Sequence, residues 1–185
     1  MDVLTLAASC GPGVDPVTTA AIVKLESGYE PLVIRDNTLS LTLRPISREA
    51  AGATVRELMK RGHRLAIGLM QVTTPWTDRL RVHPAELLDA CTNVRIGTWI
   101  LKQNYQACRT TRDPKAALEC ALSAYWTGNG QVGGAYVNAI YATSRSPFRI
   151  AETPGVTDGL LGPAQVRGVP RLTVGARPGF DFAKR

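Results

Sequence analysis

The segment from Asp15 to Gly28 contains both a helix start and a helix stop, and it constrains the fold more than any other stretch. Asp15 is a favourable N-cap, Pro16 suits the first helical turn, and Gly28 suits the left-handed residue that ends a helix. Helical spacing places one apolar stripe along the segment, formed by Val14, Val17, Ala21, Ile22 and Leu25. The sequence therefore predicts a short helix that packs one face on a core.

Glu26 lies in the last turn of this helix, beside the apolar stripe. Partial burial and the negative end of the helix dipole both disfavour a charged carboxylate there. They favour the protonated form, which a general acid requires. For this segment alone, a solvated carboxylate at a helix end is the simpler interpretation, and motifs farther along the chain reverse that preference.

Capping signals predict further helices, so that we expect a mostly α chain of the α+β class. Ser47 caps a helix that ends at Gly62, and Asn93 caps a central helix that reaches about Ala107. Asp113-Pro114 opens the next helix, and a glycine-rich turn at 128–134 leads into the last one.

Shorter elements are expected between these helices. Two β-prone runs, 32–35 and 39–43, flank Asp36-Asn37 and predict a small β-hairpin. The run 65–72 is mostly apolar and carries one amide, Gln71, whereas 84–89 fits a single helical turn.

The chain of 185 residues has the length of one domain, which we place at residues 1–145. From residue 146 onward prolines and glycines recur without a periodic apolar face, which predicts a flexible C-terminal tail at 146–185. The segment 1–10 carries an acidic residue and too short an apolar stretch for a signal peptide, so we interpret it as the start of the folded domain. No apolar run approaches the length of a membrane span.

The charge and the cysteines narrow the classes of partner and cofactor. The net charge is +7, but the basic residues are spread along the chain, so nucleic-acid binding is allowed and not indicated. Four cysteines without a C-x-x-C spacing, and only two histidines, argue against a zinc site. Two disulfides in an oxidising compartment are the better interpretation.

Helix geometry favours one pairing of these cysteines. If Asn93 caps the central helix, Cys91 and Cys108 lie at its opposite ends. A helix of that length spans roughly 20 Å, beyond the reach of a disulfide. Cys108 follows the central helix and Cys120 lies about two turns into the next, antiparallel helix, so we expect these two to pair. That pairing leaves Cys10 for Cys91.

Short motifs follow one another in a fixed order. They are Glu26-Ser27, then Gly68-Leu69-Met70-Gln71, then Ala124-Tyr125-Trp126-Thr127-Gly128-Asn129, and finally Tyr136-Val137. In these motifs the chain resembles the soluble lytic transglycosylases, a lysozyme-like family that cleaves peptidoglycan. The resemblance covers about residues 10–142 and implies a lysozyme-like helical domain with a small β-hairpin insertion.

Finer features resemble the branch of that family that serves type IV secretion and conjugation machines. They are the cysteine ahead of the first helix, the insertion between Glu26 and Gly68, Cys91-Thr92-Asn93, and the run 121–125 ahead of Thr127-Gly128-Asn129. This resemblance implies a periplasmic protein that acts on peptidoglycan glycan strands, with components of a secretion apparatus as possible partners. A signal peptide is not visible in this sequence.

The resemblance also implies roles for individual residues. Glu26 would be the catalytic acid and base. Substrate-binding or orienting roles are expected for six residues: Ser27, Gln71, Tyr125, Trp126, Asn129 and Tyr136. Trp126 is the tryptophan that we expect in the cleft, whereas Trp99 is expected in the core. No metal or cofactor is implied.

The chain departs from the family pattern at two places. Trp126 stands where the pattern Ala-Tyr-Asn-x-Gly has asparagine, so the polar contacts of that asparagine cannot be carried over. Gly133-Gly134-Ala135 stand where a Glu-Thr pair often precedes Tyr-Val. Substrate contacts from that region are therefore not expected here.

The implied reaction opens the bond between N-acetylmuramic acid and N-acetylglucosamine and leaves a 1,6-anhydro ring on the muramic acid. The motifs supply one carboxyl group, Glu26, whereas a glycoside hydrolase usually uses two. The alternatives are a muramidase that cleaves the same bond with water, or a non-catalytic module that binds peptidoglycan during assembly.

Overall fold

The computed structural model describes residues 2–144, which form seven α-helices, one 3-10 helix and a small sheet. The helices are α1 (Val3–Cys10), α2 (Pro16–Ser27), α3 (Arg48–Lys60), α4 (Thr74–Leu80), η1 (Pro84–Leu88), α5 (Ala90–Arg109), α6 (Pro114–Thr127) and α7 (Gly134–Ser144). The expected mostly α fold is confirmed. The tail predicted at 146–185 and its boundary with the domain lie outside the described residues.

Helix ends follow the capping signals of the sequence. The Asp15 carboxylate accepts hydrogen bonds from the backbone amides of Val17 and Thr18, and Gly28 takes a left-handed conformation with φ of 63° directly after α2. Asp113 caps α6 in the same way as Asp15 caps α2. The segment 3–10, expected to begin the domain, forms α1.

The prediction of one apolar stripe along α2 is wrong at one end, because Leu25 is 39% exposed. The helix packs against both α1 and α7, so most of its circumference is covered, including the side chains of Thr18 and Thr19. Polar threonines are therefore inside and Leu25 is on the open side.

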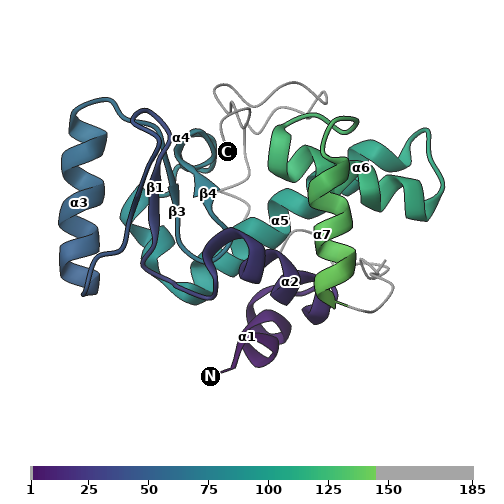
Figure 1. Ribbon diagram of the computed structural model, residues 1–185, viewed down its shortest axis with the longest axis horizontal. Coiled ribbons are helices and arrows are strands. Elements are labelled where there is room, and N and C mark those ends of the chain that lie inside the picture. The colour runs from purple at the N-terminus through teal and green to yellow at the C-terminus, as the bar shows by residue number, and fades with distance from the viewer. Residues whose placement is uncertain (1, 145–185) are drawn as a thin grey trace.

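The central helix begins earlier than predicted. Asp89, not Asn93, is the N-cap of α5, and its carboxylate accepts a hydrogen bond from the amide of Thr92. Figure 1 shows α5 running through the middle of the molecule, with α3 and the sheet on one side and α6 and α7 on the other. The core therefore gathers around α5, where Ile96, Trp99 and Ile100 are buried.

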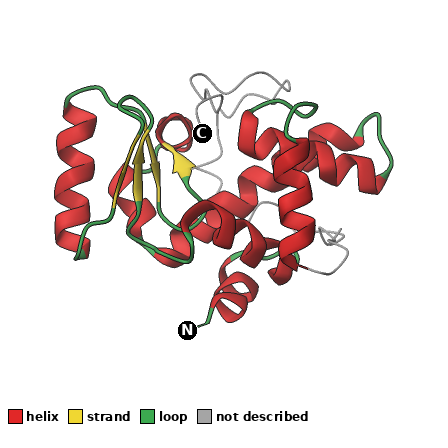
Figure 2. Cartoon of the chain, viewed as in Figure 1, coloured by secondary structure: helices red, strands yellow, loops and turns green. Residues whose placement is uncertain are grey.

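The predicted hairpin is present as β1 (Ile34–Asp36) and β2 (Leu41–Leu43), but it is part of a larger sheet. Strands β3 (Leu65–Ile67) and β4 (Val72–Thr73) extend it to four antiparallel strands in the order β2-β1-β3-β4. Ile34 pairs with Leu43 on one side and with Ile67 on the other. In Figure 2 this sheet lies between α3 and the remaining helices.

Two disulfides join the helices, Cys10 to Cys91 and Cys108 to Cys120. This is the predicted pairing. Cys91 and Cys108 lie near opposite ends of α5, as expected, so they are too far apart to pair with each other.

The disulfide between Cys10 and Cys91 is expected to contribute more to stability than the other one. It closes a loop with a sequence separation of 81, against 12 for Cys108 and Cys120. Chain entropy then gives about 4–5 kcal/mol for the longer loop and about 3 kcal/mol for the shorter one. Urea unfolding of two proteins, each with one pair changed to serine, measures both values. Equal losses, or a larger loss for Cys108 and Cys120, would contradict this order.

A contact between the buried Asp36 carboxylate and the half-buried His63 side chain holds the turn after β1. The Asp36 carboxylate is 1% exposed, and its Oδ2 lies 2.6 Å from Nδ1 of His63. Its Oδ1 accepts hydrogen bonds from the amides of Thr38 and Leu39. Burial alone would raise the pKa of Asp36, but these hydrogen bonds and the charge of His63 outweigh burial and lower it.

This lowered pKa predicts a loss of stability in acid. A carboxylate whose pKa is lower in the folded than in the unfolded chain stabilises the fold above its unfolded pKa. The contribution of Asp36 disappears as the pH falls through its folded pKa, which lies below the ordinary value of 3.8. We expect Asp36→Asn to lower the free energy of unfolding at pH 7 by about 1–3 kcal/mol and to flatten its dependence below pH 4. Urea titrations of both proteins between pH 3 and pH 7 test this, and parallel pH curves would refute it.

Candidate active site

Glu26 faces a tyrosine from the far end of the described chain. The Tyr136 hydroxyl donates a hydrogen bond to Oε1 of Glu26 at 2.8 Å. Glu26 lies in the last turn of α2 and is half-buried, whereas Tyr136 lies in the first turn of α7 and is buried. The contact follows from the packing of α2 on α7. Tyr136, one of the residues expected to bind substrate, therefore contacts the Glu26 carboxylate directly.

Trp126 stacks on the ring of Tyr136. Its ring lies parallel to that of Tyr136, with 5.4 Å between the ring centroids and 3° between the planes. Trp126 is half-buried in the last turn of α6. Three helices, α2, α6 and α7, thus bring together a carboxyl group, a phenol and an indole.

The motif Gly68 to Gln71 forms a tight turn between β3 and β4. The Gln71 amide donates to the Gly68 carbonyl at 3.1 Å, and both residues take positive φ, 75° at Gly68 and 48° at Gln71. The Gln71 side chain is buried, and its Nε2 donates to the carbonyls of Gly68 and Val33. Its Oε1 is buried without a hydrogen-bond partner among the described residues. The amide side chain therefore stabilises the turn, and a sugar contact by Gln71 stays a prediction.

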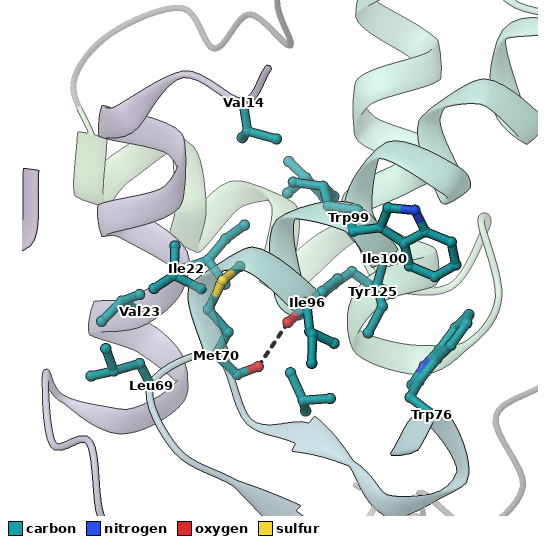
Figure 3. Packing of buried hydrophobic residues seen from close by; sticks show 14 of the residues in the cluster. Val14, Ile22, Val23, Leu69, Met70, Trp76, Ile96, Trp99, Ile100 and Tyr125 are labelled. Atoms are coloured by element: carbon teal, nitrogen blue, oxygen red, sulfur yellow. Dashed lines mark hydrogen bonds between the residues drawn. The ribbon is translucent and has the colours of Figure 1, made fainter. Parts of the chain in front are cut away.

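Tyr125 joins this turn to α6. Its hydroxyl donates to the Met70 carbonyl at 2.7 Å, an interaction drawn in Figure 3. The Met70 side chain packs against α5 at Gly97, where an added Cβ would lie 2.5 Å from Sδ. Tyr125 and Gly97 together place the backbone of the turn, and a sugar contact by Tyr125 stays a prediction.

Asn93 is the residue of this region that the sequence interpretation missed. It is fully buried, and its side chain makes three hydrogen bonds of 2.8 Å. Oδ1 accepts from the Met70 amide, and Nδ2 donates to the carbonyls of Ile67 and Leu87. The available signal was a polar residue among the apolar positions of the central helix, and the cap interpretation obscured it.

Ser27 and Asn129 order the backbone around the site. The Ser27 hydroxyl donates to the Val23 carbonyl at 2.9 Å within α2. Oδ1 of the Asn129 side chain accepts a hydrogen bond from the Gln131 backbone amide. The backbone carbonyl of Asn129 accepts one from the Ser123 hydroxyl. Substrate contacts by Ser27, Asn129 and Trp126 stay predictions.

The other two tryptophans belong to the core. Trp76 and Trp99 are buried and meet edge to face, with 6.1 Å between the ring centroids. The expectation that Trp99 lies in the core is confirmed. Trp126 is the one of the three that is only half-buried.

Neither a metal cluster nor a membrane-spanning element occurs in the part of the chain that the structure describes. No group of three or more His, Cys, Asp or Glu side chains within residues 2–144 could hold a metal ion. Within the same range no helix has the length and apolar character to cross a bilayer.

Comparison with known proteins gives one consistent result. Residues 4–142 match the transglycosylase SLT domain family. Protein virB1 of Rhizobium radiobacter is 36% identical over 143 residues, which cover 76% of this chain and 60% of that protein. Type IV secretion system protein virB1 of Brucella abortus biovar 1 is 33% identical over 128 residues, 68% of this chain and 54% of that protein. No solved structure matches.

These matches extend the evidence of the motifs. The chain spans 54–60% of the length of the two relatives. The family match covers nearly all of the described residues and includes Glu26, the turn from Gly68 to Gln71, and Tyr136. The chain therefore belongs to the transglycosylase SLT domain family.

Proposed function

We propose that this protein is a lytic transglycosylase, which cleaves peptidoglycan between N-acetylmuramic acid and N-acetylglucosamine. The hydrogen bond from the Tyr136 hydroxyl to Glu26 is the observation that carries the proposal. It gives a half-buried carboxyl group at a helix end a neutral partner that donates a hydrogen bond without adding a charge. Such a carboxyl group suits an acid that must also act as a base.

In the proposed reaction Glu26 gives up one proton and then takes back another. Its carboxyl group first protonates the glycosidic oxygen while the bond from C1 of muramic acid to that oxygen breaks. The muramic acid N-acetyl group assists at C1. The carboxylate then takes the proton of the 6-hydroxyl of the same muramic acid, and O6 forms a bond to C1. The products are a glycan ending in N-acetylglucosamine with a free 4-hydroxyl and one ending in a 1,6-anhydro ring, so no water is consumed.

Three of the other carboxyl groups have structural tasks, which supports a mechanism with a single carboxyl group at the scissile bond. Hydrolysis of a glycoside usually needs a second carboxylate across the scissile bond. Asp36 is paired with His63, Asp89 caps α5, and Glu86 accepts the His83 amide in the cap of η1. Each of these three groups already accepts a backbone amide or contacts the half-buried His63 side chain.

The relatives suggest where this activity is used. The Brucella relative is a type IV secretion system protein by name. We propose that the chain opens the cell wall locally in the periplasm while a secretion or conjugation apparatus assembles, with peptidoglycan as substrate and other components of that apparatus as partners. The two disulfides suit an oxidising compartment of this kind.

The masses of the released products test the proposal. The protein is incubated with purified peptidoglycan, and the soluble muropeptides are weighed. We expect products one water lighter than those of hydrolysis. Products with a reducing muramic acid would identify a muramidase, and binding without release would identify a non-catalytic module.

A further inference from the structure

We infer that Trp126 is a positioning residue, which fixes the Tyr136 hydroxyl on Glu26 by stacking against the Tyr136 ring. This inference rests on the proposed function of Glu26. Trp126 replaces the asparagine of the family pattern, so the device belongs to this chain and not to that pattern.

The geometry of the stack supports this role. Centroids 5.4 Å apart and planes 3° apart fall within the range of favourable offset stacking between aromatic rings. A tyrosine ring turns about two side-chain bonds, and its hydroxyl lies at the far end of the ring. A flat partner alongside the ring removes most of these rotations. The hydroxyl is then held where it meets Oε1 of Glu26 at 2.8 Å.

The backbone on either side of the stack is fixed independently. The Ser123 hydroxyl donates to the Asn129 carbonyl at 2.6 Å and accepts from the Gly133 amide at 2.8 Å. An added Cβ on Gly133 would lie 2.7 Å from Cα of Ser123, so the glycine-rich turn lies directly on α6. Ser123 thus places the start of α7, and the stack with Trp126 acts on the direction of the Tyr136 ring itself.

A positioning role for Trp126 and a sugar-binding role for Trp126 predict different changes in KM and kcat. A platform for a sugar ring contributes to substrate binding, so its loss raises KM. A residue that holds the Tyr136 hydroxyl on Glu26 acts on the proton-transfer steps, so its loss lowers kcat. Because it acts through Tyr136, its loss has no further effect once that hydroxyl is absent.

Steady-state kinetics on peptidoglycan fragments tests the inference with four test variants and one control variant of the full chain. We expect Trp126→Ala to lower kcat about tenfold with KM within about twofold of the wild type, an effect typical of a misplaced catalytic group. Trp126→Phe keeps a flat ring and is expected to restore most of kcat. Tyr136→Phe and the double variant with Trp126→Ala are expected to have equal kcat. Val132→Ala is the control, since Val132 is 66% exposed on the same glycine-rich turn.

Two kinetic results would overturn the inference. One is an unchanged kcat in Trp126→Ala, with or without a raised KM. The other is a double variant slower than Tyr136→Phe by the full factor of Trp126→Ala. A wild-type protein that releases no anhydro products would instead refute the proposed function. A crystal structure of Trp126→Ala tests the inference without a measurement of activity. We expect the Tyr136 hydroxyl to lie away from Glu26 in that structure, and a hydroxyl that has not moved would refute the inference.

Discussion

Glu26→Gln is expected to slow the release of muropeptides by about 10²–10⁴-fold, the usual contribution of general acid–base catalysis. Glutamine keeps the size of the side chain, and its amide oxygen can still accept the hydrogen bond from the Tyr136 hydroxyl. It has no proton to give to the glycosidic oxygen and no carboxylate to take one from the 6-hydroxyl. Both halves of the proposed reaction therefore fail, while binding of the glycan strand is expected to persist.

Two measurements separate these effects. Mass spectrometry of the released muropeptides gives the rate, and co-sedimentation with insoluble peptidoglycan gives the binding. Glu30→Gln is the matched control, because it is the same substitution four residues farther along the chain. The Glu30 side chain is exposed and paired with Arg44. Full activity of Glu26→Gln would reduce Glu26 to an ordinary carboxylate at a helix end. Equal losses in both variants would point to an effect of net charge and not of proton transfer.

Local chemistry explains why most helix ends could be predicted from the sequence. A cap is formed by residues within one turn of each other, as when Asp15 bonds the amides of Val17 and Thr18. Asp89 and Asn93 lie four residues apart and are both good caps, so the sequence alone could not choose between them. Packing decides, because Asn93 is needed inside the protein to bond Met70 and two carbonyls.

The extent of the sheet depends on contacts that the sequence does not display locally. Ile34 pairs with Ile67, 33 residues farther along the chain. All three residues of β3 are buried, so the strand lacks the alternation of apolar and polar residues that would mark it. The hairpin of β1 and β2, with its turn at Asp36, had a local signal and was predicted.

The distinction between local sequence signals and contacts of distant segments also applies to the site. The motifs identify Glu26 as the candidate acid because they follow one another along the chain in the order of the family pattern. Two tyrosines follow α2 in the matched motifs, and only the packing of α7 on α2 brings Tyr136 to within 2.8 Å of Glu26. The stack of Trp126 on Tyr136 arises from the meeting of α6 and α7, at a position where this chain departs from the family pattern.

Asn93→Ala is expected to cause the largest loss of stability among single substitutions around the site. Its side chain bonds the Met70 amide and the carbonyls of Ile67 and Leu87, and alanine leaves all three backbone groups buried without those partners. One unsatisfied buried group costs about 1–3 kcal/mol, and partial relaxation limits the sum to about 3–5 kcal/mol. Gly68 also depends on this site, since an added Cβ there would lie 2.4 Å from Nδ2 of Asn93.

Urea unfolding followed by circular dichroism measures this loss. Asn104→Ala is the matched control, because Asn104 lies on the same helix and is only half-buried, so its loss is expected to stay below about 0.5 kcal/mol. In the fraction of Asn93→Ala that stays folded, release of muropeptides is also expected to fall, because Met70 and Gln71 lie in the turn that Asn93 holds. A loss of stability no larger than that of Asn104→Ala would show that the turn keeps its place without Asn93. The hydrogen bond from Tyr125 to the Met70 carbonyl would then be the contact that holds it.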